Sequence, residues 1–179
     1  MSSFVPHNAL TVKANGLARV IQTLVKVSLP VASAEEAAQR NITIRDYQGI
    51  WDTGATNSVI TKKVVDELGL KPTGVVEVHH AHGKTNANVY LVNIILPNKV
   101  VLPIIRVTEG VLNEVDLLIG MDVITQGDFS ITNKNGKTTM SFRIPSCKEI
   151  DYVPESNEYN QVMINGSRKL RDQYQAKYS

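Results

Sequence analysis

Residues 50–60 place one acidic side chain between two strand-forming runs. An apolar run ends at Trp51, Asp52 follows it, and a β-branched run resumes at Val59. Gly54 lies between these runs and marks a tight turn, so the sequence predicts a strand, a short loop that carries Asp52, and a second strand. Because loops on a rigid scaffold commonly carry catalytic groups, Asp52 is the first candidate for chemistry.

The neighbours of Asp52 suit a functional turn. Gly54 has no Cβ, so another chain or a substrate can approach its backbone closely. The Thr53 hydroxyl can form a hydrogen bond across the loop or across a symmetry axis, and Thr56 and Ser58 can cap the turn. The plainer alternative is that Asp52 only caps the end of a strand.

Two sequence elements carry a family resemblance together. Residues 50–56 read Ile-Trp-Asp-Thr-Gly-Ala-Thr and are followed by Ser-Val-Ile at 58–60, and residues 116–124 read Asp-Leu-Leu-Ile-Gly-Met-Asp-Val-Ile. They resemble the active-site loop of the retropepsin-like, single-domain aspartic proteases and the apolar-apolar-Gly segment that closes the core behind this loop. The resemblance covers roughly residues 18–145. It implies an all-β fold, a half-barrel with one or two short helices that assembles as a symmetric dimer.

The resemblance also implies a role for each group of matching residues. Asp52 would be catalytic, and the residues that support its loop would be Thr53, Gly54, Ala55 and Thr56. The core loop behind the active site would consist of Ile119, Gly120, Met121 and Asp122. A hairpin that follows the catalytic loop would form a flap over bound substrate, with His80, Ala81, His82, Gly83 and Lys84 near its tip.

The number of catalytic carboxylates decides the expected assembly. Aspartic protease chemistry needs two carboxyl groups that share one proton, and this chain contains a single Asp-Thr-Gly. A symmetric homodimer would supply the second group from Asp52 of another copy. The resemblance therefore implies a homodimeric endopeptidase with a polypeptide substrate. The alternative is a catalytically silent dimeric binding or assembly module with the same fold.

Two departures from the viral members point to another branch of the family. Met121 stands where viral enzymes commonly carry an arginine, and Thr56 stands where they commonly carry an aspartate. An Arg-Asp pair that supports the dimer is therefore absent. Cellular and bacterial relatives often have Gly-Met-Asp, as at residues 120–122, so the resemblance is to a non-viral branch.

No cofactor and no metal are expected. His80 and His82 would share one face of a strand, yet no cysteine lies near them and no further ligand has suitable spacing for zinc. Histidines that touch substrate are the favoured interpretation. The sequence also lacks the Gly-x-Ser-x-Gly, Walker, His-Glu-x-x-His and Cys-x-x-Cys motifs of other enzyme classes.

Composition sets the remaining limits. The 179 residues suffice for one domain, and the net charge of +2 is too small to predict a nucleic-acid or membrane partner. No apolar run approaches the roughly twenty residues that span a bilayer, and the start of the chain lacks signal-peptide features. The single Cys147 cannot form an internal disulfide. A cytoplasmic location is the default expectation.

The expected domain order is an N-terminal arm at 1–16, a protease-like domain at 17–145 and a polar C-terminal tail at 146–179. The last segment is interpreted as a tail or a marginal helix. Within the domain, short helices are predicted after Ser33 and after Thr61, each of which can cap a helix. Polar turns predict three hairpins, with tips at residues 81–86, 97–98 and 133–136.

Overall fold

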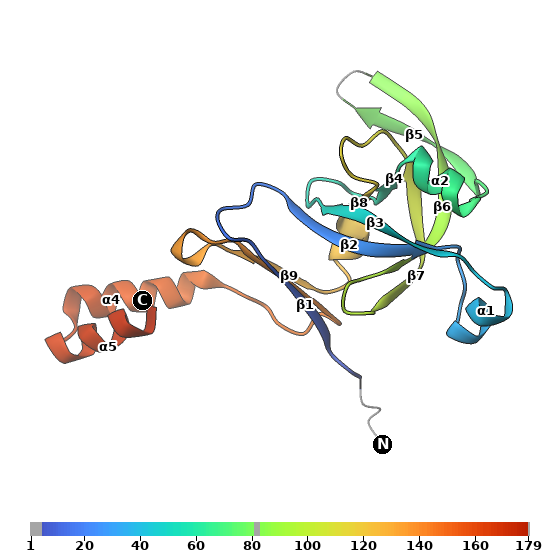
Figure 1. Cartoon of the computed structure of the whole chain (residues 1–179). Coiled ribbons are helices and arrows are strands. Elements are labelled where there is room, and N and C mark those ends of the chain that lie inside the picture. The colour runs from blue at the N-terminus through green and yellow to red at the C-terminus, as the bar shows by residue number, and fades with distance from the viewer. Residues whose placement is uncertain (1–4, 81–82, 179) are drawn as a thin grey trace. The chain divides into compact units, whose positions relative to one another are not determined.

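A computed structural model of the chain describes residues 5–80 and 83–178. The chain divides into two compact units, Met1–Ser146 and Cys147–Ser179 (Figure 1). The first unit carries every strand of the described residues, and the second is built from two helices.

The larger of two sheets holds the strands on either side of Asp52. Its order is β2-β3-β8-β4-β7-β6-β5, and β2 also pairs with β6, so the sheet curls back on itself. Seven strands form this sheet within the described residues: β2 (Ile21–Ser28), β3 (Ile44–Trp51), β4 (Val59–Ile60), β5 (Gly74–His80), β6 (Gly83–Ile95), β7 (Val101–Glu109) and β8 (Leu117–Ile119). Both parallel pairings, β3 with β8 and β4 with β7, involve the strands that enter and leave the Asp52 loop.

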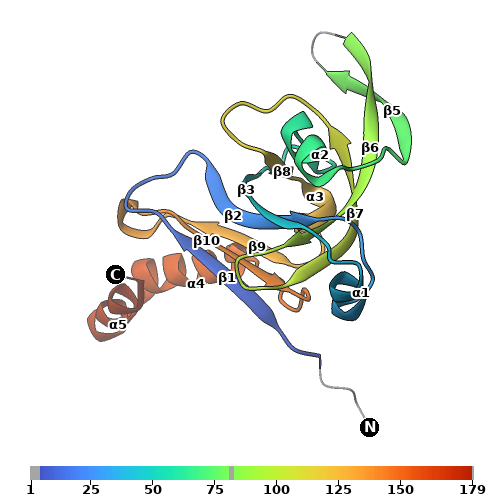
Figure 2. The ribbon, with the colours of Figure 1, turned by 45° about the vertical axis from the view of Figure 1, so that its right-hand side comes forward.

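The smaller sheet has the order β1-β10-β9 and joins the two ends of the first unit (Figure 2). It contains β1 (Asn8–Lys13), β9 (Asp128–Thr132) and β10 (Thr139–Ile144). Residues 8–13, which were expected in an N-terminal arm, thus pair antiparallel with β10 of the same chain. The 3-10 turn η1 (Lys134–Gly136) connects β9 to β10 and occupies the turn predicted at 133–136.

Trp51 at the end of β3 links the two sheets. Its ring stacks on Phe129 of β9 with centroids 5.8 Å apart and tilts against Phe142 of β10 at 5.1 Å. Its indole Nε1 donates a hydrogen bond of 3.0 Å to the Thr23 hydroxyl on β2. Trp51 is therefore a packing residue that fixes the strand leading into Asp52.

Three short helices lie in the described part of the first unit. They are α1 (Ala34–Gln39), α2 (Lys62–Leu68) and α3 (Met121–Ile124). Ser33 caps α1 by accepting a hydrogen bond from the Glu36 amide. Thr61 is the N-cap residue of α2, but its side chain makes no capping bond, and its buried hydroxyl has no partner within the described residues. Gly69 ends α2 in the left-handed conformation with φ of 61°.

Strands β5 and β6 form a hairpin that extends beyond the rest of the sheet (Figure 1). Their register continues to His80↔Gly83, so Lys84, Thr85 and Asn86 lie in a strand and not in the polar tip that the sequence predicted. The backbone ladder needs no apolar side chains, and Lys84 forms an ion pair of 2.8 Å with Glu77 across the two strands. The predicted tip residues Ala81 and His82 lie outside the described residues.

The second unit consists of α4 (Tyr152–Asn165) and α5 (Arg168–Tyr178), in the segment that the sequence analysis interpreted as a polar tail or a marginal helix. Asp151 caps α4 by accepting a hydrogen bond from the Val153 amide. Tyrosines of α5 donate hydrogen bonds to glutamates of α4: Tyr178 to Glu155 at 2.7 Å, and Tyr174 to Glu158. Polar side chains make these bonds, so an apolar pattern in the sequence could not have predicted that the two helices pair.

Candidate active site

Asp52 lies on a loop that its own carboxylate helps to hold. Its backbone amide donates a hydrogen bond of 3.0 Å to the Ile119 carbonyl of β8, which continues the β3–β8 pairing into the loop. The Gly54 amide donates a 2.8 Å bond to Asp52 Oδ1 and fixes one carboxylate oxygen. Because the side chain is only half-buried, the carboxylate keeps contact with solvent.

Ser58 fastens the far end of this loop to the segment behind it. The side chain is fully buried, and its Oγ donates a hydrogen bond of 2.8 Å to Asp122 Oδ1. The same Oγ accepts a bond of 3.1 Å from the Gly120 amide. Asp122 Oδ1 also accepts a bond from the Val123 amide at 3.1 Å, so one carboxylate ties the loop to the start of α3.

Backbone bonds add to this connection. The Met121 amide donates to the Ala55 carbonyl at 2.8 Å, and the Asp122 amide donates to the Thr56 carbonyl at 3.2 Å. Gly120 makes the close approach possible: a Cβ at that position would lie 2.7 Å from the Asn57 carbonyl carbon. Any other residue would push the two segments apart.

The loop presents an open outer face in the single chain. Thr53, Gly54 and Thr56 are exposed, in contrast to the buried Ser58 on its inner side. A carboxylate that is fixed by one amide, reached by water and carried on a rigid loop can act as a general base toward a bound water. A second carboxyl group, which carries the proton that Asp52 lacks, is needed to polarise the carbonyl of a peptide bond.

The base of the β5–β6 hairpin is tied to the strand beside the loop. Tyr90 of β6 donates a hydrogen bond of 2.7 Å from its hydroxyl to Glu109 Oε2 at the end of β7. Burial, followed by the Glu109 carboxylate, raises the pKa of Tyr90 above its ordinary value. On the other side of the hairpin, the Thr73 amide donates to the Val89 carbonyl at 2.7 Å. The hairpin is thus anchored on both strands near residue 89, and its outer part is free of β7.

The structure brings together two of the three residue groups that the sequence singled out. Residues 52–56 and 119–122 contact each other through the bonds described above, whereas Lys84 lies in the hairpin strand and is exposed. Sequence reasoning treated Ser58 only as a turn cap and missed its bonds to Gly120 and Asp122. The available signal was a serine inside an otherwise β-branched run. Within the described parts of the chain, no three His, Cys, Asp or Glu side chains gather as a metal site.

The fold and the Asp52 loop define an aspartic-protease-like domain, and comparison with known proteins gives its family. The family model described as "gag-polyprotein putative aspartyl protease" matches residues 38–126, about half of the chain. Over this segment the chain is similar to the retropepsin-like aspartyl proteases that the family model describes. A comparison with curated protein sequences gave no match.

Similar solved structures come from three kinds of organism. A retropepsin-like aspartic protease from Rickettsia conorii has 12% identity and a TM-score of 0.48, with 79% of this chain and 98% of that chain covered. The foamy viral protease-reverse transcriptase has 16% identity and a TM-score of 0.38, with 84% of this chain and 16% of that chain covered. The retroviral protease-like domain of Ddi1 from Leishmania major has 16% identity and a TM-score of 0.37, with 74% of this chain and 99% of that chain covered.

In the part of the chain that is described, no helix combines the length and the apolar character that crossing a bilayer requires.

Proposed function

We propose that this chain is an aspartic endopeptidase that works as a homodimer, with Asp52 of each copy as the catalytic pair. The observation that carries the proposal is the Asp52 carboxylate, which is fixed by the Gly54 amide at 2.8 Å on a loop with an exposed outer face. The sequence contains a single Asp-Thr-Gly, so one chain supplies one carboxylate of this kind. Two copies related by a two-fold axis would bring two of them together.

The chemistry requires different protonation states in the two copies. One Asp52 carboxylate takes a proton from a bound water, and the protonated carboxyl of the other copy polarises the carbonyl of the peptide bond. Two carboxylates a few ångström apart share one proton and titrate as a unit, so activity falls when the pair loses that proton or gains a second one. Water is the nucleophile, so no covalent intermediate forms. Thr53, which is exposed in the single chain, holds the two loops together across the axis.

The substrate is an extended polypeptide that lies under the β5–β6 hairpin. Extended peptides bind to exposed strands through backbone hydrogen bonds, and side-chain pockets then supply selectivity. The anchored base of the hairpin supports this role, because Tyr90 and Glu109 restrain the hairpin beside the Asp52 loop and leave its outer part unpaired with β7. Residues 80–84 contact the substrate in this proposal.

The test is cleavage of an unstructured protein such as casein between about pH 4 and about pH 8, at several enzyme concentrations. Wild type and Asp52→Asn are compared. The control is Asp46→Asn, which removes from β3, the strand that leads into Asp52, an exposed carboxylate that pairs with Lys26. The proposal predicts that wild-type activity rises faster than linearly with concentration while the dimer forms. It predicts no activity for Asp52→Asn and unchanged activity for the control.

Two results would contradict the proposal. Equal cleavage by wild type and Asp52→Asn would show that Asp52 is not catalytic. No cleavage by a wild-type protein that sediments as a dimer would favour the catalytically silent binding module, in which the same loop only holds two copies together.

A further inference from the structure

We propose that one end of the small sheet is a docking surface for anionic membranes, which rests on the bilayer and does not cross it. This surface, which we call the basic tip, consists of Leu17 and four basic residues: Lys13, Arg19, Lys134 and Lys137. The proposal goes beyond the protease activity, because it concerns where the chain is held and not which bond it cleaves. It rests on the charges, the hydrogen bonds and the exposure of the two loops that form the tip.

The charges of the chain are distributed unevenly along the sequence. Residues 1–34 contain no aspartate or glutamate, and residues 129–148 contain none either. The two stretches together carry seven basic residues: Lys13, Arg19, Lys26, Lys134, Lys137, Arg143 and Lys148. The net charge of +2 for the whole chain is an average that hides this local excess of positive charge.

The fold brings the two stretches together at one end of the small sheet. β1 pairs with β10 in a register that ends at Lys13↔Thr139. The loop that follows β1 therefore lies beside the turn that precedes β10, and the two are adjacent in both views of the chain (Figure 1 and Figure 2). The β5–β6 hairpin projects from another part of the first unit, so a surface bound to the tip leaves the hairpin free.

Thr138 holds the two loops together from the inside. It is 2% exposed, its amide donates a 3.0 Å bond to the Gly16 carbonyl, and its carbonyl accepts a 2.9 Å bond from the Ala14 amide. Its hydroxyl accepts a 2.9 Å bond from the Ala18 amide and donates a 2.6 Å bond to Asn133 Oδ1. Thr138 and these four partners are the sequence neighbours of the five tip residues. The bonds of one buried threonine thus gather the whole basic tip.

The four basic side chains of the tip are exposed and have no ion pair within the described residues. Two other cations of the acid-free stretches are paired, Lys26 with Asp46 at 2.7 Å and Arg143 with Asp128. Like charges that are gathered without a carboxylate repel one another, and an anionic surface relieves that repulsion. The tip is therefore suited to a partner with many negative charges.

Leu17 favours a membrane as that partner. Its side chain is 70% exposed on the loop between Lys13 and Arg19. At a membrane surface, basic side chains contact anionic head groups while an apolar side chain enters the boundary with the acyl chains. Single-stranded nucleic acid is bound instead with the help of aromatic side chains that stack on bases. Residues 13–20 and 133–138 contain no Phe, Tyr or Trp.

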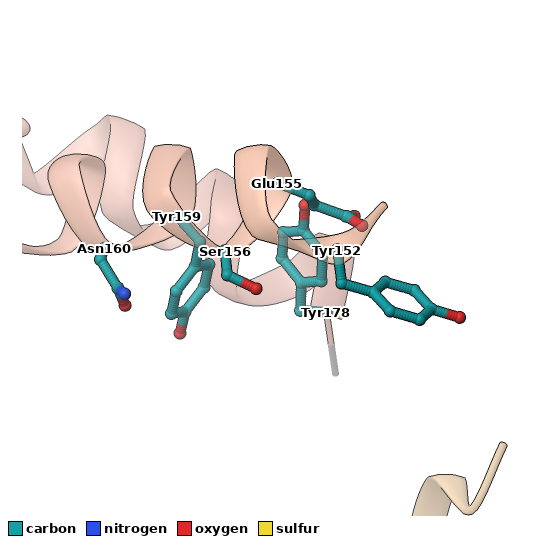
Figure 3. Close-up of a pocket in the computed structure, with 6 residues that line it drawn as sticks. All are labelled: Tyr152, Glu155, Ser156, Tyr159, Asn160 and Tyr178. Carbon is teal, nitrogen blue, oxygen red and sulfur yellow. The ribbon is translucent and has the colours of Figure 1, made fainter. Parts of the chain in front are cut away.

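The second unit differs from the basic tip in its balance of charge. Residues 147–179 carry five basic and five acidic side chains. Lys177 lies over the Tyr178 ring at 5.0 Å, and the hydroxyl of that ring donates to Glu155. The same ring borders a hollow of about 560 Å³, which is lined by Tyr152, Glu155, Ser156, Tyr159, Asn160 and Tyr178 (Figure 3). Charges of both signs are mixed in this unit, so it supplies suitable positions for control substitutions.

The test measures binding of the full chain to lipid vesicles by co-sedimentation at about 50 mM salt, where screening is weak. One set of vesicles contains phosphatidylcholine alone, and the other contains about 30% phosphatidylserine in addition. The charge variant replaces three lysines of the tip: Lys13→Gln, Lys134→Gln and Lys137→Gln. Its matched control removes three exposed lysines elsewhere and has the same net charge: Lys71→Gln, Lys99→Gln and Lys169→Gln.

A second variant tests the apolar part of the tip. It carries Leu17→Ser, and its control is Ile164→Ser on α4, where the side chain is 73% exposed. Arg19 stays unchanged in every variant, because it lies two positions before Ile21, whose partner Trp51 adjoins the Asp52 loop.

Wild type is expected to bind the anionic vesicles at least about tenfold more tightly than the neutral ones, and about 300 mM salt should remove most of this difference. The charge variant should bind the anionic vesicles at least about tenfold more weakly, since each basic side chain near such a surface contributes about fivefold. Leu17→Ser should weaken binding at least about threefold, because a buried apolar side chain is lost. Both controls should bind as wild type does.

Three results would overturn the proposal. The first is equal binding, or no binding, of wild type to the two kinds of vesicle. The second is equal weakening in the charge variant and its matched control, since net charge and not the tip would then be responsible. The third is unchanged binding by Leu17→Ser together with tight binding of a single-stranded RNA, which would assign the tip to nucleic acid. The assay involves no peptide cleavage, so failure of the casein test would leave it intact.

Discussion

Ser58→Ala tests whether the hydrogen bonds of the Ser58 hydroxyl hold the Asp52 loop in place. The substitution removes one oxygen atom and no carbon, so it leaves almost no cavity. It deletes the 2.8 Å bond to the Asp122 carboxylate and the 3.1 Å bond from the Gly120 amide. A hydrogen bond to a charged group contributes about 1.5–3 kcal/mol, and a buried amide without a partner costs about 1–3 kcal/mol.

Because Asp122 keeps partial contact with water, the lower part of these ranges applies, and the expected loss of unfolding free energy is about 3 kcal/mol. For a chain of this size the loss corresponds to a fall in Tm of about 6–12 °C. The measurement is urea denaturation of the full chain, with Thr56→Ala as the control because the Thr56 side chain on the same loop is exposed. The control is expected to change stability by less than about 0.5 kcal/mol. A loss below about 1 kcal/mol for Ser58→Ala would refute the assigned role of Ser58.

Three further predictions concern the surroundings of the loop. Gly120→Ala forces a Cβ to within 2.7 Å of the Asn57 carbonyl carbon, so casein cleavage should be lost while circular dichroism still shows a folded chain. Burial, with the Glu67 carboxylate, raises the pKa of Tyr47 above its ordinary value of 10, so the protonated phenol favours the folded state. Unfolding free energy should therefore fall as pH rises above about 10, and Tyr47→Phe should flatten that slope in urea titrations. A double-mutant cycle of Trp51→Phe and Thr23→Val should give a coupling of about 1 kcal/mol from the 3.0 Å indole bond, and additive losses would contradict that bond.

Much of the fold could be predicted from local features of the sequence. The apolar face of α2 and the left-handed Gly69 that ends the helix follow from spacing within a few residues, and both are present in the structure. The Ser33 cap of α1 and the turn at 133–136 are of the same kind. Such features depend on neighbours in the chain, so a single sequence suffices to predict them.

Long-range pairings could not be predicted in this way. β1 pairs with β10 across about 130 residues, and only Leu10 of that strand is buried, so its sequence offers no clear alternation. Ser58 meets Asp122 across 64 positions through polar atoms, which no periodicity marks. The helices α4 and α5 are held together by tyrosine-glutamate bonds, and their apolar residues are too few to have indicated a packed pair.

The central claim, that one active site uses Asp52 from two copies, is tested most directly by mixing subunits. Wild-type chain at constant concentration is mixed with increasing concentrations of Asp52→Asn chain. Casein cleavage is measured after the two kinds of subunit have exchanged between dimers. The account predicts that activity falls toward zero as wild type enters mixed dimers with a single carboxylate. Asp46→Asn, which keeps the pair intact, should instead leave activity undiminished. Cleavage that stays proportional to wild type, whatever the amount of added Asp52→Asn, would contradict the shared site.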